Sequence, residues 1–224
     1  MKHLLFLLLA ALTASLAARA QGIPLNAATP QGFANANFKL VPGSVATGDL
    51  NGDGRPDAAL VLAQVAGRRG VEPGAEPARI VTVVWGKAGG GYRLALTAQN
   101  AILCPGCGGV LGDPFEKLTI TKGVLSIIHR GGSRERWRSV ARFRYQQGDF
   151  YQIGDTYDVT DSYGQPCPRL GSSYRTGSEH RDVNLVTGSF ERVRVSADCQ
   201  LAENSRGRQP VKPLVRLLDY KPQP

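Results

Sequence analysis

Short runs of apolar and β-branched residues recur along the chain, and Gly, Pro and Asn separate them. Residues 58–63 form a continuous apolar run, and residues 80–85 form a second run that is rich in Val. Runs of this length and composition predict strands that are buried on both faces. A Gly-rich turn at 89–91 separates the second run from residues 92–96, which predicts a hairpin.

Three further pairs of strand-like segments follow, and each pair is joined by a short polar turn. They are 118–120 with 124–128, 137–145 with 150–153, and 183–186 with 190–195. The Gly- and Pro-containing residues 64–78 and the Ser- and Gly-containing residues 161–180 predict irregular loops. After residue 20, no window has the 3.6-residue period of an amphipathic helix. The pattern therefore predicts an all-β protein with antiparallel, hairpin-built sheets, arranged as a sandwich or a partial propeller.

Residues 1–20 differ from the rest of the chain, because they are almost entirely apolar. Lys2 and His3 precede a leucine-rich run, and Ala18-Arg19-Ala20 follows it. A basic start, a short apolar run and a small-x-small ending are typical of a secretory signal peptide, cleaved here near Ala20/Gln21. The run is shorter than the roughly 20 apolar residues that span a bilayer. We therefore expect a secreted or periplasmic protein without a membrane span in its mature part.

The chain contains four cysteines, Cys104, Cys107, Cys167 and Cys199. In an exported protein these predict disulfides, and the simplest pairing is Cys104–Cys107 and Cys167–Cys199. Two alternatives stay open at this point. A zinc site would need two close pairs at ligand spacing, and a redox-active CxxC would need its first cysteine at a helix N-terminus.

Residues 49–57 are the most informative segment of the sequence. Asp49, Asn51, Asp53 and Asp57 place oxygen-bearing side chains at alternate positions, and the backbone carbonyl of Arg55 adds another oxygen. Ca²⁺ prefers six to eight oxygen ligands, mostly carboxylates and carbonyls. Gly54 lets the chain turn so that early and late ligands meet. The segment therefore predicts a structural Ca²⁺ site in a β-hairpin loop.

Residues 48–57, followed by an apolar strand, resemble the calcium loop of FG-GAP/VCBS repeats, which occur in secreted bacterial proteins. The resemblance covers roughly residues 33–65 and is present in a single copy. A propeller needs several blades, so the resemblance implies only the calcium-binding hairpin and no activity. We expect one mature domain, 21–224, with a calcium-loop unit at 21–100 and a β-meander unit at 101–224.

The charge of the chain favours an anionic partner. The formal net charge is +9, and it falls by two, to +7, when Lys2 and Arg19 leave with the signal peptide. Between 134 and 144, arginines occupy alternate positions that would share one face of a strand. These candidate ligand-binding residues are Arg134, Arg136, Arg138, Arg142 and Arg144. They would suit an anionic glycan or envelope polymer, with nucleic acid the weaker candidate, or their charges would be paired with carboxylates on neighbouring strands.

Residues that could support catalysis are few, and no catalytic motif is present. His129, Asp113 and Glu116 are the candidates for a small carbohydrate-active hydrolase, with Glu135 as another carboxylate. Asp155, Asp158 and Asp161 recur at every third position, which differs from the alternate spacing of the first loop. The sequence thus favours a non-catalytic binding module of the bacterial envelope. A hydrolase, or a scaffold that pairs through a strand edge, are the alternatives.

Overall fold

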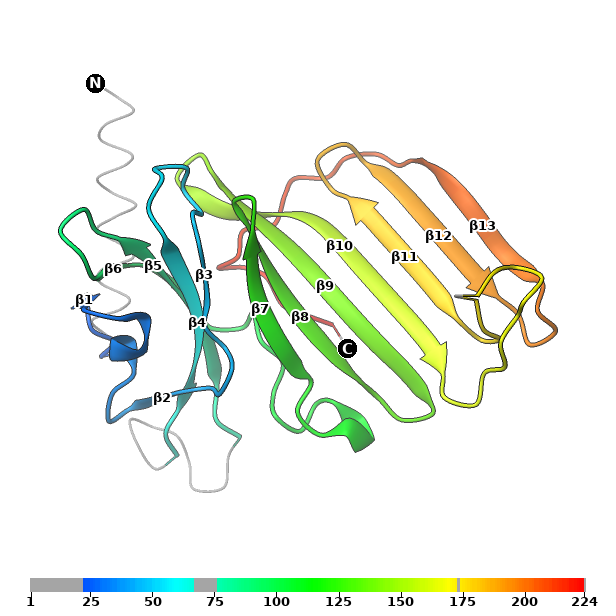
Figure 1. Cartoon of the computed structure of the whole chain (residues 1–224), viewed down its shortest axis with the longest axis horizontal. Helices are drawn as coiled ribbons and strands as arrows, with labels where there is room; N and C mark the ends of the chain where they lie inside the picture. Colours follow the sequence, from blue (N-terminus) through cyan, green and yellow to red (C-terminus); the bar gives the residue numbers. More distant parts are fainter. Residues whose placement is uncertain (1–21, 67–75, 173, 224) are drawn as a thin grey trace.

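The computed structural model describes residues 22–66, 76–172 and 174–223. Within these ranges the chain is all-β and antiparallel, as predicted, with two short 3₁₀ turns, η1 (Pro30–Phe33) and η2 (Gly109–Leu111). Two sheets pack together in a sandwich-like arrangement, in which one sheet is curled and the other is flatter (Figure 1). The signal peptide predicted at 1–20 lies outside the described residues.

The first sheet is built from the N-terminal part of the chain, in the order β1-β6-β5-β4-β2, with β3 paired to β4. Its strands are β1 (Asn26–Ala27), β2 (Phe38–Leu40), β3 (Ala46–Gly48), β4 (Asp57–Gln64), β5 (Arg79–Gly86) and β6 (Tyr92–Ala98). The central strands β4 and β5 are buried on both faces over most of their length. This confirms the prediction from the continuous apolar runs.

The two faces of β4 and β5 are covered by different parts of the molecule. On one face, Leu60 and Val84 pack with Phe33 and Phe38 of the N-terminal segment. On the other face, residues such as Val83 pack against the second sheet. A strand between two apolar layers needs no polar face, because neither side meets water.

The second sheet is a seven-stranded meander in the order β13-β12-β11-β10-β9-β8-β7. Its strands are β7 (Phe115–Thr121), β8 (Val124–Gly132), β9 (Glu135–Gln146), β10 (Asp149–Asp161), β11 (Glu179–Asn184), β12 (Ser189–Val195) and β13 (Leu201–Arg208). They lie side by side from green to orange in Figure 1. Only β7–β10 contribute buried residues to the core shared with the first sheet; these include Leu125, Phe143 and Phe150.

The C-terminal segment turns back from β13 and crosses toward β9 and β10, where it is red in Figure 1. The amide of Gln152 donates to the carbonyl of Val215 at 2.8 Å, and the amide of Leu217 donates to the carbonyl of Phe150 at 2.8 Å. Leu217 is fully buried in the shared core. The segment therefore anchors the end of the chain beside the start of β10.

The predicted hairpins are present, but several strand limits differ from the prediction. The strand predicted at 150–153 continues to Asp161 through a bulge between Gln152 and Gly154. The strand predicted at 183–186 spans Glu179–Asn184, because the Asn184 side chain accepts the amides of Val186 and Thr187 at 3.0 Å and turns the chain. Of the predicted loop 161–180, residues 162–172 and 174–178 lie outside the strands, whereas Asp161 ends β10 and Glu179 and His180 begin β11. Most of the predicted loop at 64–78 lies outside the described residues.

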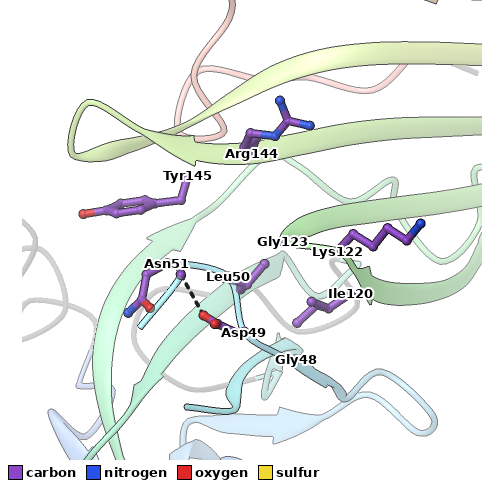
Figure 2. A pocket seen from close by; sticks show the side chains of 10 residues that line it. Gly48, Asp49, Leu50, Asn51, Ile120, Lys122, Gly123, Arg144 and Tyr145 are labelled. Atoms are coloured by element: carbon purple, nitrogen blue, oxygen red, sulfur yellow. Dashed lines mark hydrogen bonds between the residues drawn. The ribbon is translucent and has the colours of Figure 1, made fainter. Parts of the chain in front are cut away.

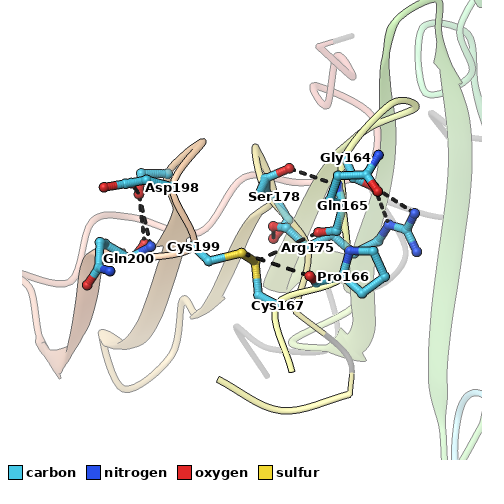
Figure 3. Close-up of a disulfide and its surroundings, with 11 residues drawn as sticks. Gly164, Gln165, Pro166, Cys167, Arg175, Ser178, Asp198, Cys199 and Gln200 are labelled. Atoms are coloured by element: carbon cyan, nitrogen blue, oxygen red, sulfur yellow. Dashed lines mark hydrogen bonds between the residues drawn. A yellow bond between two sulfur atoms is a disulfide. The ribbon is translucent and has the colours of Figure 1, made fainter. Parts of the chain in front are cut away.

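Both predicted disulfides are formed. Cys104 is bonded to Cys107, and Cys167 is bonded to Cys199 across 32 residues (Figure 3). The pairing excludes a four-cysteine zinc site, since the sulfurs are bonded to each other. Two disulfides indicate an oxidising, extracytoplasmic environment. In the part of the chain that the structure describes, no helix is long and apolar enough to cross a membrane.

Candidate functional site

The acidic loop joins β3 to β4 at one end of the first sheet. Gly52 and Gly54 both have φ of +78°, a conformation that glycine adopts without steric cost. The two glycines fold the loop back on itself, so that Asp49 at its start lies close to the backbone of its middle. The turn position predicted for Gly54 is therefore observed.

The side chains of the loop accept hydrogen bonds from its own backbone amides. Asp49 accepts the amides of Gly52 at 2.7 Å and Gly54 at 2.9 Å. Asn51 Oδ1 accepts the amide of Asp53 at 2.9 Å, and Asp53 Oδ1 accepts the amide of Arg55 at 2.9 Å. These bonds fold three alternate side chains back onto the loop backbone, which is the arrangement that Asx turns produce.

Asp57 differs from the other three candidate ligands, because it is fully buried. Its carboxylate accepts the amide of Leu50 at 2.9 Å and the amide of Gly86 at 2.9 Å, so it ties the loop to the end of β5. Burial raises the pKa of Asp57, the two backbone hydrogen bonds oppose the shift, and the negative charge of Asp53 adds to it. Within the described ranges Asp57 forms no ion pair, so its charge is buried without a cationic side chain.

The donor chemistry of the loop fits a hard cation, because every candidate ligand atom is an oxygen. Each carboxylate oxygen that accepts one amide retains a further lone pair. The three carboxylates are not gathered on one point, however. Among the described residues, the only group of three acidic, His or Cys ligand atoms within 4.8 Å of one another is Glu76 with Cys104 and Cys107. Those two sulfurs form a disulfide and are poor ligands.

An open hollow lies between the acidic loop and the second sheet (Figure 2), with a volume of about 530 Å³. The loop contributes Asp49, Leu50 and Asn51, and the turn between β7 and β8 contributes Lys122. Arg144 comes from the end of β9, where it is exposed and forms no ion pair within the described residues. The fold thus brings an acidic segment and two cations to one surface depression.

The arginine series lies on β9 or next to it, and its alternation is as predicted. Ala141 and Phe143 point into the core, whereas the arginines of the series are only partly buried or exposed. Three of the five are paired with carboxylates: Arg134 with Asp161 at 3.0 Å, Arg138 with Glu116 at 3.1 Å, and Arg142 with Asp182 at 3.0 Å. Arg136 reaches the Ser162 hydroxyl at 3.4 Å. Arg144 is exposed, and within the described residues its side chain has neither an ion pair nor a hydrogen bond.

The residues considered for catalysis have structural partners. His129 is 1% exposed, and its Nε2 accepts the amide of Leu103 at 3.3 Å. Burial, with the nearby Arg79 charge, lowers the pKa of His129 to about 4, so the ring is neutral near pH 7. Asp113 forms a two-fold ion pair with the buried Arg79, and this pairing lowers its pKa against the effect of burial. Glu116 is held by Arg138, as described above.

Asp155, Asp158 and Asp161 do not form a common site. Asp155 is opposite Ala141 and Asp158 is opposite Arg138 in the register of β9 and β10, which places them on opposite faces. Asp155 pairs with Arg181 at 3.1 Å, and Asp158 approaches His180 at 2.6 Å. Glu135 starts β9 at an exposed position.

No family model, curated protein or solved structure matches this chain. The FG-GAP/VCBS resemblance of residues 33–65 therefore remains a prediction from the sequence. The hollow beside the acidic loop was not foreseen, because nothing in the local sequence places Lys122 next to Asp49. The packing of β3 against β7, where Gly48 lies close to Ile120, joins them.

Proposed function

We propose that this protein is an exported, calcium-stabilised and non-catalytic binding module that holds an anionic group of an envelope polymer. Residues 1–20 serve as the cleaved signal, which agrees with the two disulfides. The observation that carries the proposal is the shared hollow: Lys122 and Arg144 line the same depression as Asp49 and Asn51.

Calcium in the loop would serve the fold first. Asp57 is a buried carboxylate without a cationic partner in the described ranges, and such a charge is costly unless it is neutralised. Asp49, Asn51, Asp53 and Asp57 would hold the ion, together with the carbonyl of Arg55. The ion would supply positive charge at the edge of the hollow and fix the connection from β3 to β4.

The anion would bind beside this ion, because Arg144 and Lys122 lie on the other wall of the hollow. Arg144 has a planar fork that suits a carboxylate or a phosphate. Three other arginines of the series are already ion-paired: Arg134 with Asp161, Arg138 with Glu116, and Arg142 with Asp182. The binding surface is therefore the end of the arginine series and not its whole length.

Thermal melting with Ca²⁺ and with a chelator tests the proposed calcium site. A ligand that binds only the native form raises the melting temperature, and we expect half-saturation at roughly 10⁻⁴ to 10⁻³ M. Asp49→Asn should weaken this response without removing the Asp57 carboxylate. A melting temperature that does not respond to millimolar Ca²⁺ in the natural chain would reject the metal assignment.

The affinity for polygalacturonate and for lipopolysaccharide, measured at several salt concentrations, tests the proposed anion-binding surface. The double variant Lys122→Ser with Arg144→Ser should lose most of the affinity, and the remaining binding should depend less on salt. Arg134→Ser is the matched control, because it also removes an exposed arginine of the series but leaves the hollow intact. Equal losses in the control and in the double variant would contradict the site.

A further inference from the structure

A second hollow lies on the core-side face of β9–β12, beyond the area that the first sheet covers. It has a volume of about 570 Å³, within the usual range for small-molecule sites. Ser139, Asp155, Tyr157 and Arg181 line it from neighbouring strands, and Tyr220 lines it from the C-terminal segment. The register places Ser139 opposite Tyr157, and Tyr157 opposite Arg181, so these side chains share one face.

Arg181 is the main cationic group of this hollow. Its Nη2 donates to Asp155 Oδ2 at 3.1 Å, and its guanidinium lies over the Tyr157 ring, 5.7 Å from the centroid. The Nε atom of Arg181 is buried and has no hydrogen-bond partner among the described residues. The Arg181 side chain as a whole is 43% exposed, so its other N–H groups can bind an oxygen of a ligand in the hollow. The planar fork of an arginine suits a carboxylate.

The other groups of the lining suit hydroxyls and a small ring. Asp155 can accept from hydroxyl groups, and Ser139 and Gln152 can both donate and accept. Burial and the charge of Asp155 raise the pKa of Tyr220, so its phenol keeps its proton and remains a donor. The charged lining residues are Arg181, Arg192 and Lys221 against Asp155 and Glu179, which leaves an excess of positive charge.

We propose that this hollow binds a small, hydroxyl-rich carboxylate, the chemistry of a uronic acid sugar. The carboxylate is held by Arg181 and the ring hydroxyls by Asp155, Gln152 and Ser139. Tyr157 supplies an aromatic wall for the ring. The ligand is either a free sugar or the end of a uronic acid chain, because both present the same groups. The proposal is independent of the acidic loop and its hollow.

Calorimetry with galacturonate, with short oligogalacturonates and with neutral galactose tests the proposal. We expect galacturonate to bind and galactose to bind at least about tenfold more weakly, since it lacks the charged partner of Arg181. Binding of the oligomers but not of the monomer would assign the site to chain ends. Equal binding of galactose, or no binding of either acid at millimolar concentrations, would overturn the proposal.

Variants locate the site and separate binding from folding. Arg181→Met should weaken galacturonate binding at least about tenfold. Arg206→Met is the matched control, because Arg206 is also ion-paired, with Glu191, but lies on the opposite face. Should Arg181→Met fail to fold, Ser139→Leu adds bulk to the lining without removing a charge, and it should block binding. A loss of galacturonate binding in Arg206→Met as large as that in Arg181→Met would refute the assignment to this hollow.

Discussion

The two halves of the seven-stranded sheet are held in different ways. Strands β7–β10 lie against the first sheet and supply large apolar side chains to the shared core, including the fully buried Phe143 and Phe150. Strands β11–β13 supply none to either core cluster. They are attached by backbone pairing, by ion pairs such as Arg142–Asp182 and by the Cys167–Cys199 disulfide, and their buried apolar side chains are the smaller Val183, Val193 and Val195.

This difference indicates which half contributes most to the free energy of folding and which half carries a ligand-sized hollow. Burial of apolar area is the dominant favourable contribution to folding, so the β7–β10 half should open only with the whole domain. The β11–β13 half has exposed polar groups on both faces, and it carries the hollow around Arg181. Each prediction below tests whether the two halves differ in this way.

The largest effect is expected for Phe143→Ala. Phe143 is fully buried and packs edge-on against Tyr220 with ring centroids 5.1 Å apart. Removing a buried phenyl group leaves a cavity and should lower the free energy of unfolding by about 3–5 kcal/mol. Urea denaturation measures the loss, and hydrogen exchange should show it in both sheets. A loss confined to β11–β13 would contradict the division into halves.

The next largest effect concerns the disulfide of the second half. Replacing Cys167 and Cys199 by Ser releases a loop closed across 32 residues, which the chain-entropy relation converts to about 3–4 kcal/mol. The effect should be local, with faster hydrogen exchange in β11–β13 and little change in β4 and β5. Replacing Cys104 and Cys107, which are three residues apart, is the control and should cost under about 2 kcal/mol. Equal exchange rates in both sheets after the first replacement would argue against a separate second half.

The same division explains which parts of the fold the sequence predicts. The strands around Val83 and Phe143 were predicted because their apolar residues must be buried, and burial imposes a pattern. Strand β13, Leu201–Arg208, was not predicted, since it is exposed over most of its length and has no apolar alternation. The continuation of β10 past Gly154 was not predicted, because Asp155 and Asp161 interrupt the apolar alternation on the face that Tyr157 and Val159 share.

The candidate sites follow a related rule. The acidic loop is local in sequence, so its turn and its alternate donors could be predicted from residues 49–57. The disulfides could be paired because the number of cysteines is small. The charge pairing of Arg134, Arg138 and Arg142 depends on residues from other parts of the chain, and the hollow around Arg181 depends on four strands and the C-terminal segment. Contacts of that kind are set by the register, which the sequence pattern does not specify.

A pH-dependent effect of intermediate size is expected in the β7–β10 half, at His129 on β8. Its pKa in the folded protein is about 4, against an ordinary value of 6.5. Between these values the unfolded chain binds a proton that the folded chain does not, so stability falls as pH decreases from about 6.5 to about 4. The full difference corresponds to about 3 kcal/mol. Urea denaturation at several pH values measures it.

His129→Gln separates this contribution from that of the carboxylates, because Gln does not titrate and its side-chain oxygen can accept the Leu103 amide. We expect the variant to lose most of the pH dependence between 4 and 6.5. His180→Gln is the matched control, since it removes a more exposed histidine, which lies on β11. An unchanged pH profile in His129→Gln would show that His129 is not the group responsible.

The smallest effect is expected from two ion pairs: Arg142–Asp182, which joins β9 to β11, and Arg206–Glu191, which lies within the β11–β13 half. Arg142 and Asp182 are both partly exposed, and such pairs contribute about 0.2–1 kcal/mol. The Thr156 hydroxyl lies between them: Arg142 donates to it, and it donates to Asp182. The pair Arg206–Glu191 has no such bridge among the described residues, and Arg206 is more exposed. Double-mutant cycles should therefore give a larger coupling energy for Arg142–Asp182 than for Arg206–Glu191, and Thr156→Val should reduce it. Equal couplings would mean that the Thr156 bridge adds nothing to the Arg142–Asp182 pair.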